Sequence, residues 1–309
     1  MMTTASRRFF GLSLLAAMTL NPLAHAAPES AVKAPALTPT GESAALPHSR
    51  EFTITSRAGK DYRIFVSVPP GEPPPEGYGV LVVLDANAYF GAAADAMGLL
   101  RQFPMMPEKG NLTDAAPTLV VGVGYPGDEA INGERRTWDF VPAAKNPASL
   151  ERLRGPKPGG ADAFTDFLVN ELRPAIASAY RVNPSRQTLA GHSLGGYYAL
   201  HALATQPQSF QRYVAISPAV WWDDSRILKD LATLKPGKAQ VMLTMATEEW
   251  PGWPEGSTEM LDGARSVRDV LRRVGVKGDA LRYVELSSQD HMTTPFATMP
   301  VVTRWSSLP

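Results

Sequence analysis

A serine between two glycines is the residue with the clearest potential for chemistry in this sequence. Gly191-His192-Ser193-Leu194-Gly195 follows an apolar run, and an Ala- and Leu-rich stretch begins at Gly196. A strand, a sharp turn and a helix form the setting in which a G-x-S-x-G serine projects its hydroxyl as a nucleophile. We expect both flanking glycines to be required, because a side chain there would strike a neighbouring strand or helix. The backbone N–H of Leu194 would lie at the helix N-terminus, where it can stabilise an oxyanion.

A nucleophilic serine needs a base, and the chain has five histidines from which to choose it. Four are excluded because they lie in the N-terminal segment, beside the nucleophile, or roughly 12 Å along the following helix: His25, His48, His192 and His201. His291 is left as the base. His291 follows the last apolar run, Leu281–Leu286. This position fits the chain order of serine, acid and histidine found in enzymes with this type of turn.

The acid of the site is expected after the apolar run Val241–Met245, where two adjacent carboxylates occur. Glu249 is slightly favoured over Glu248. Asp290 adjoins His291 and is poorly placed to reach its outer nitrogen. A serine–histidine dyad, with the imidazole oriented by a backbone carbonyl, is the alternative to a triad.

A second oxyanion donor is expected in the turn that follows the apolar run Val80–Leu84. The backbone N–H of Asn87, or that of Ala86, would serve together with that of Leu194. A competing interpretation is that Asp85 and Asn87 only form a turn.

Two other kinds of site are excluded by their patterns. Residues 122–127 match G-x-G-x-x-G after an apolar run, but Pro126 and the residues after it do not open a helix, so dinucleotide binding is not expected. The sequence has no H-E-x-x-H and few histidines, so no catalytic metal is expected. We therefore predict an enzyme without a cofactor.

Alternating strand and helix patterns predict an α/β-hydrolase fold, with a central, mostly parallel sheet and helices on both faces. An N-terminal antiparallel hairpin is expected from the alternating runs 51–55 and 62–68. The helix expected over 161–180 should be kinked by Pro174. Between these elements, residues 126–160 carry little periodicity and are typical of a long functional loop.

The first 48 residues are expected to lie outside this domain. Arg7-Arg8 precede an apolar run and the small residues Ala24 and Ala26, so residues 1–26 are predicted to be a signal peptide cleaved near Ala26. The arginine pair resembles a twin-arginine signal, and an ordinary secretory signal is the alternative. Residues 27–48 are predicted to be a disordered lead-in, and 49–309 the hydrolase domain. We therefore expect a periplasmic protein, and the apolar run is too short for a membrane anchor.

Composition excludes several kinds of site and of binding partner. The chain has no cysteine, which removes disulfides and thiolate metal sites. Without the two arginines of the signal peptide, 28 basic and 30 acidic residues are left. This balance gives no reason to expect binding to nucleic acid or to an anionic membrane.

Several motifs occur in an order that resembles the esterase D-type hydrolases, from about residue 50 to the C-terminus. They are Asp85-Ala86-Asn87-Ala88, Val121–Tyr125, Arg136-Thr137-Trp138-Asp139-Phe140-Val141-Pro142, Gly191–Gly196 and Ser217-Pro218. Within that group the chain is most similar to periplasmic esterases of trilactone siderophores of the enterobactin, salmochelin and bacillibactin kind. The resemblance implies that Ser193 and His291 are catalytic and that Arg136 binds substrate.

The long loop is also suited to an anionic substrate. Residues 135–157 contain six basic residues against Asp139 and Glu151. Arginines together with Trp138 and Trp222 would suit a bulky anion that carries aromatic rings, such as a ferric catecholate. Core packing of Trp222 and a solvated surface for the loop cations are the competing interpretations.

We therefore expect an exported serine esterase that cleaves the ester backbone of ferric catecholate siderophores through an acyl-enzyme. One alternative is a general carboxylesterase that acts on small acyl or sugar esters. Another is a ligand-binding protein on a hydrolase scaffold, against which the intact Ser193 and His291 argue.

Overall fold

The computed structural model describes residues 45–102, 115–153, 156–249 and 257–308. These residues belong to one compact unit, Ala45–Pro309. The predicted signal peptide, and all but the last four residues of the predicted lead-in, lie outside the described residues. No helix within the described ranges is long and apolar enough to span a membrane.

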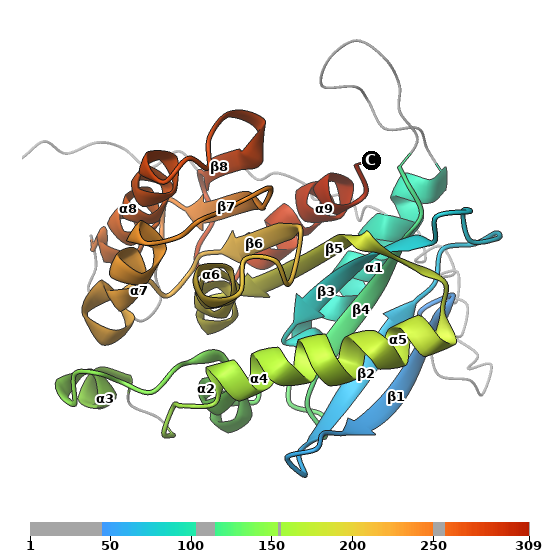
Figure 1. Cartoon of the computed structure of the whole chain (residues 1–309), viewed down its shortest axis with the longest axis horizontal. Coiled ribbons are helices and arrows are strands. Elements are labelled where there is room, and N and C mark those ends of the chain that lie inside the picture. The colour runs from blue at the N-terminus through green and yellow to red at the C-terminus, as the bar shows by residue number, and fades with distance from the viewer. Residues whose placement is uncertain (1–44, 103–114, 154–155, 250–256, 309) are drawn as a thin grey trace, which may run out of the picture. The chain divides into compact units, whose positions relative to one another are not determined.

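The described residues form one eight-stranded sheet in the order β1-β2-β4-β3-β5-β6-β7-β8 (Figure 1). β1 and β2 form the predicted antiparallel hairpin, β2 runs antiparallel to β4, and all other neighbours are parallel. The strands are β1 (Ser49–Thr55), β2 (Asp61–Ser67), β3 (Tyr78–Leu84), β4 (Thr118–Gly124), β5 (Val182–His192), β6 (Arg212–Ile216), β7 (Gln240–Ala246) and β8 (Leu281–Leu286).

Helices cover both faces of this sheet. In chain order they are α1 (Ala86–Gln102), α2 (Gly133–Phe140), α3 (Ala148–Leu153), α4 (Ala161–Phe167), the π-helical η1 (Leu168–Leu172), α5 (Arg173–Ala179), α6 (Leu194–Thr205), α7 (Trp222–Ala232), α8 (Glu259–Arg273), the 3₁₀ turn η2 (Gly278–Ala280) and α9 (Thr294–Ser306). Figure 1 shows α4 and α5 as one long rod that crosses in front of the sheet.

The burial of β3 explains why both faces must be covered. All seven of its residues are buried, and successive side chains point to opposite faces. Val82 belongs to the core cluster that contains Tyr197 of α6, whereas Val83 belongs to the cluster that contains Phe90 of α1 and Met299 of α9. A strand that is apolar on both sides is stable only between two helical layers.

Four regions differ from the sequence-based expectation. Residues 126–160, expected as a loop, contain α2 and α3, and neither α7 nor α9 was expected. The helix over 161–180 contains a π-helical segment that ends just before Pro174. Proline lacks the N–H that would donate to the carbonyl four residues earlier. The wider π-helical turn changes the hydrogen-bond register before Pro174 and lets the helix continue.

Candidate active site

Four polar residues follow the carboxyl ends of four neighbouring parallel strands. Ser193 follows β5, Ser217 follows β6, Glu249 lies beyond β7, and His291 lies beyond β8. Because these strands are parallel, their carboxyl ends meet at one edge of the sheet. Residues that are far apart in the chain therefore assemble at the place where open α/β sheets bind ligands.

Ser193 occupies a strained turn between β5 and α6. Its φ of 59° and ψ of −116° are uncommon for a residue with a side chain. The turn is held by Ser193 N–H, which donates to the carbonyl of Ile216 at 2.9 Å, and by Ser193 O, which accepts from Tyr197 N–H at 2.9 Å and Ala219 N–H at 3.1 Å. This geometry is that of a nucleophile elbow.

The glycines around the elbow are not equivalent. A Cβ on Gly191 would lie 2.3 Å from the carbonyl oxygen of Gly195, so no side chain fits there. At Gly195 the nearest atom to such a Cβ would be 3.5 Å away, which is ordinary contact. At Gly196 the carbonyl oxygen of Ile216 would be 2.9 Å away. The expectation that both flanking glycines are required is therefore wrong for Gly195, and Gly196 supplies the second close approach.

His291 and Glu249 form a direct pair. Nδ1 of His291 lies 2.6 Å from Oε2 of Glu249. A carboxylate oxygen can only accept, so Nδ1 carries the proton, and Nε2 is left with the lone pair that a base needs. Of the two carboxylates considered, Glu249 is buried against His291, whereas Glu248 is exposed.

Ser217 holds the other oxygen of the same carboxylate, a contact that the sequence did not predict. Its hydroxyl donates to Oε1 of Glu249 at 2.7 Å, and the backbone N–H of Ala246 donates to that oxygen at 3.0 Å. Ser217 is fully buried and has a φ of 41°. A serine directly after the strand beside the nucleophile strand was the available signal.

His192 is buried beside His291 and is not a second base. Its Nδ1 lies 3.0 Å from the hydroxyl of Tyr89, and its ring centroid is 4.5 Å from that of His291. Burial, followed by the nearness of His291 and Arg136, lowers the pKa of His192 well below its ordinary range. His192 is therefore neutral near pH 7, and its ring packs against that of His291.

The expected oxyanion donors lie at the N-termini of two helices on neighbouring strands. Leu194 is the first residue of α6, and Ala86 is the first residue of α1. The first N–H groups of a helix have no partner within it, so those of Leu194, Ala86 and Asn87 are available to a ligand. The Asn87 side chain fixes this turn by donating to the carbonyls of Tyr125 at 3.0 Å and Gly127 at 3.2 Å.

Arg136 lies within the protein. Its Nε and Nη2 donate to the two carboxylate oxygens of Asp85 at 3.0 and 2.9 Å, and Nη2 also donates to the carbonyl of His192 at 3.2 Å. These contacts are to protein groups, so the substrate-binding role that the resemblance implies stays a prediction.

The two tryptophans proposed for substrate binding have different surroundings. Trp222 is fully buried in the main core cluster, so it cannot contact substrate and the prediction for it is wrong. Trp138 is 41% exposed, and Nζ of Lys60 lies 4.6 Å from the centre of its ring. Within the described residues, no group of three or more His, Cys, Asp or Glu side chains is placed to hold a metal ion.

A family model described as "Putative esterase" matches residues 55–296. The chain belongs to this esterase family. The esterase is 31% identical over 261 residues to the ferri-bacillibactin esterase BesA of Bacillus subtilis, covering 82% of this chain and 88% of the relative. It is 33% identical over 232 residues to the siderophore triacetylfusarinine C esterase of Aspergillus fumigatus, covering 70% and 73%.

A solved structure, that of the BES protein from Bacillus cereus, superposes with a TM-score of 0.73 at 29% identity. The match covers 89% of this esterase and 100% of that chain. Together with the strand order, it confirms the predicted α/β-hydrolase fold. Family membership makes the protein a carboxylic-ester hydrolase, as the sequence predicted.

Proposed function

We propose that this esterase hydrolyses the ester backbone of ferric catecholate siderophores through an acyl-enzyme. The observation that carries the catalytic part is the contact between His291 and Glu249 at the edge of the sheet that also bears the Ser193 elbow. The relatives named as siderophore esterases support the choice of substrate.

In the proposed reaction, Oγ of Ser193 attacks the ester carbonyl while Nε2 of His291 takes the hydroxyl proton. The N–H groups of Leu194 and Asn87 stabilise the oxyanion, and Glu249 stabilises the imidazolium. His291 then gives its proton to the departing alcohol. A water molecule then attacks the acyl carbon and loses a proton to the same Nε2. The bond from that carbon to Oγ breaks, the acid leaves, and His291 returns the proton to Oγ of Ser193.

The surface around α2 supports an anionic aromatic substrate. Trp138 exposes part of its ring, and the ammonium of Lys60 lies over that ring. We propose that Trp138 stacks on a catechol ring of the substrate while nearby cations offset its negative charge.

Hydrolysis of p-nitrophenyl acetate tests the esterase activity without any assumption about the natural substrate. We expect turnover by the wild type and a loss of about 10⁶-fold in Ser193→Ala. A fluorophosphonate should label the wild type and leave Ser193→Ala unlabelled. Wild-type protein that shows neither turnover nor labelling would contradict the proposed mechanism.

Product analysis separates a siderophore esterase from a general carboxylesterase. Ferric enterobactin and simple aryl esters are compared by kcat/KM, with the siderophore products resolved by chromatography. We expect the siderophore to be the better substrate, and Trp138→Ala to reduce its turnover more than that of p-nitrophenyl acetate. A kcat/KM that is equal or lower on the siderophore would favour the general carboxylesterase.

We further propose that the protein works in the periplasm after export by the twin-arginine route. The support is the Arg7-Arg8 pair and the apolar run after it. Fractionation of cells that express the full chain should find the mature protein in the periplasm. Arg7→Lys/Arg8→Lys should keep the precursor in the cytoplasm, and unchanged export of this variant would point to the general secretory route.

A further inference from the structure

The two strand ends that precede the candidate oxyanion donors lie side by side. β3 and β5 are parallel neighbours, and Val83 is level with Ala190 in their register. Asp85 and His192 come two residues after this pair, Asp85 directly after β3 and His192 as the last residue of β5. The first N–H groups of α1 follow Asp85, and those of α6 follow the elbow. The separation of the two donors therefore depends on how these strand ends are held.

One guanidinium connects both strand ends. Arg136 comes from α2 and donates two hydrogen bonds to the carboxylate of Asp85, at 3.0 and 2.9 Å. The same Nη2 donates to the backbone carbonyl of His192 at 3.2 Å. Arg136 is 9% exposed and Asp85 is 2% exposed, so water does not replace these contacts easily. A planar, bidentate fork fixes direction as well as distance.

The charge of Asp85 also matters for the oxyanion. A Cβ built on Gly195, in the first turn of α6, would lie 3.5 Å from Oδ2 of Asp85. A carboxylate this close to the elbow would oppose the negative charge that develops there, unless a cation compensates it. Burial by itself disfavours the charged guanidinium, but the charge of Asp85 raises the pKa of Arg136 overall. Arg136 therefore keeps its proton, and its positive charge lies 2.9 Å from Oδ2 of Asp85.

We propose that Arg136 is a positioning residue of the oxyanion hole. Its guanidinium holds Asp85 and the carbonyl of His192 together, which sets the separation of the two helix N-termini, and it neutralises the carboxylate beside them. This role rests on the proposed esterase reaction and differs from direct substrate binding. The N–H groups of the two helices bind the oxyanion that forms from every ester substrate. Loss of Arg136 would misplace these N–H groups, so it should weaken stabilisation of the transition state for any ester.

The test compares Arg136→Gln, Arg136→Lys and the double variant Asp85→Asn/Arg136→Gln on p-nitrophenyl acetate and on ferric enterobactin. Arg136→Gln should lower kcat about 10²-fold on both substrates with little change in KM. The double variant removes the uncompensated carboxylate, so it should regain about tenfold. The kcat of Arg136→Lys should lie between those of the wild type and Arg136→Gln, because lysine keeps the positive charge but cannot make the bidentate contact.

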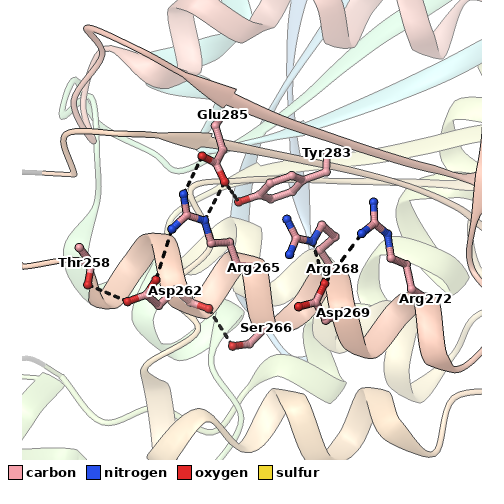
Figure 2. A network of polar contacts seen from close by, with 9 residues as sticks. All are labelled: Thr258, Asp262, Arg265, Ser266, Arg268, Asp269, Arg272, Tyr283 and Glu285. Carbon is pink, nitrogen blue, oxygen red and sulfur yellow. Dashed lines mark hydrogen bonds and ion pairs between the residues drawn. The ribbon is translucent and has the colours of Figure 1, made fainter.

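The affinity of a transition-state analogue distinguishes a positioning role from a general effect on stability. A trifluoromethyl ketone adds to Ser193 and forms an oxyanion, so its affinity should fall across the variants in proportion to kcat/KM. The matched control is Arg265→Gln. Arg265 of α8 makes the same kind of bidentate contact with Glu285 of β8, at 2.8 and 2.9 Å (Figure 2). This variant should leave kcat, KM and inhibitor affinity unchanged.

Each outcome bears on the inference. Losses confined to ferric enterobactin, or seen in KM alone, would assign Arg136 to substrate contact and overturn the positioning role. Unchanged kcat in Arg136→Gln, with an active wild type, would overturn it and leave the esterase function intact. A wild type without turnover would overturn both. If Arg136→Gln does not fold, the double variant, which leaves no unpaired buried charge, carries the same comparison.

Discussion

Oε2 of Glu249 lies 2.6 Å from Nδ1 of His291, while Oε1 of the same carboxylate accepts a hydrogen bond from Ser217. The two oxygens thus have different partners: Oε2 contacts the imidazole, and Oε1 accepts from Ser217 and from the N–H of Ala246. This division fixes the rotation of the carboxylate, and through it the ring of His291. The arrangement favours a triad over the dyad that the sequence left open.

Glu249→Gln should separate a triad from a dyad. The amide keeps the shape of the side chain but no longer stabilises the imidazolium, so kcat on p-nitrophenyl acetate should fall about 10³- to 10⁴-fold. Glu248→Gln is the adjacent control, and because Glu248 is exposed its kcat should stay at the wild-type level. Equal activity of Glu249→Gln and wild type would support a dyad.

Ser217→Ala should show what fixing the carboxylate contributes. Loss of a hydrogen bond to a charged group corresponds to roughly 10- to 100-fold in kcat if Glu249 then rotates away from His291. Ser266→Ala is the control, since Ser266 bonds a backbone carbonyl on the outside of α8 (Figure 2). If kcat in Ser217→Ala stays within twofold of wild type, the N–H of Ala246 is sufficient to hold Oε1.

His192 should make the free energy of unfolding depend on pH. The pKa of His192 is depressed in the folded protein, whereas in the unfolded chain it returns to about 6.5. Below pH 6.5 the unfolded state therefore binds a proton that the folded state does not, and stability falls by up to about 1.4 kcal/mol per pH unit.

Urea unfolding of wild type and His192→Asn between pH 5 and pH 8 measures this contribution. Asn keeps a polar group near the position of Nδ1, so the contact with Tyr89 can persist, but it cannot titrate. The difference in free energy of unfolding between the two proteins should be constant above about pH 7 and should shrink as the pH falls below 6.5. A difference that does not vary with pH would show that His192 is not held neutral.

The glycines of the elbow should differ in their tolerance of a methyl group. Gly191→Ala places a Cβ against the carbonyl of Gly195, so it should destabilise the protein by about 3 kcal/mol or more and remove activity. Gly195→Ala meets only ordinary contacts within a helix, where alanine is favoured over glycine, so it should stay within about 1 kcal/mol of wild type. Equal destabilisation of both variants, measured by urea unfolding, would contradict the difference in free space between the two positions.

Some parts of the site could be predicted because they depend on local order along the chain. The elbow requires a strand, a glycine-flanked serine and a helix in succession, and all three are visible around Ser193. His291 could be selected because the other histidines were excluded by position. The α/β-hydrolase fold followed from alternating apolar runs, since a strand that is apolar on both faces must lie between two layers of helices.

Other residues could not be assigned from the sequence, because their roles depend on which side chain is buried against which. Glu248 and Glu249 are neighbours with the same chemistry, and only packing directs one to His291. Trp138 and Trp222 are the same residue type, yet one is partly exposed and the other lies in the core. The roles of Ser217 and Asp85 depend on partners 32 and 51 residues away.

The local pattern and order of residues were enough to predict the type of sheet, which the structure confirms, and to select Ser193 and His291 as the proposed nucleophile and base. Three contacts required the folded chain: Glu249 with His291, Trp222 with the core, and Arg136 with Asp85. The physical reason is that parallel strands bring distant loops to one edge. There, burial, the direction of each side chain and the need to compensate every buried charge select the partners.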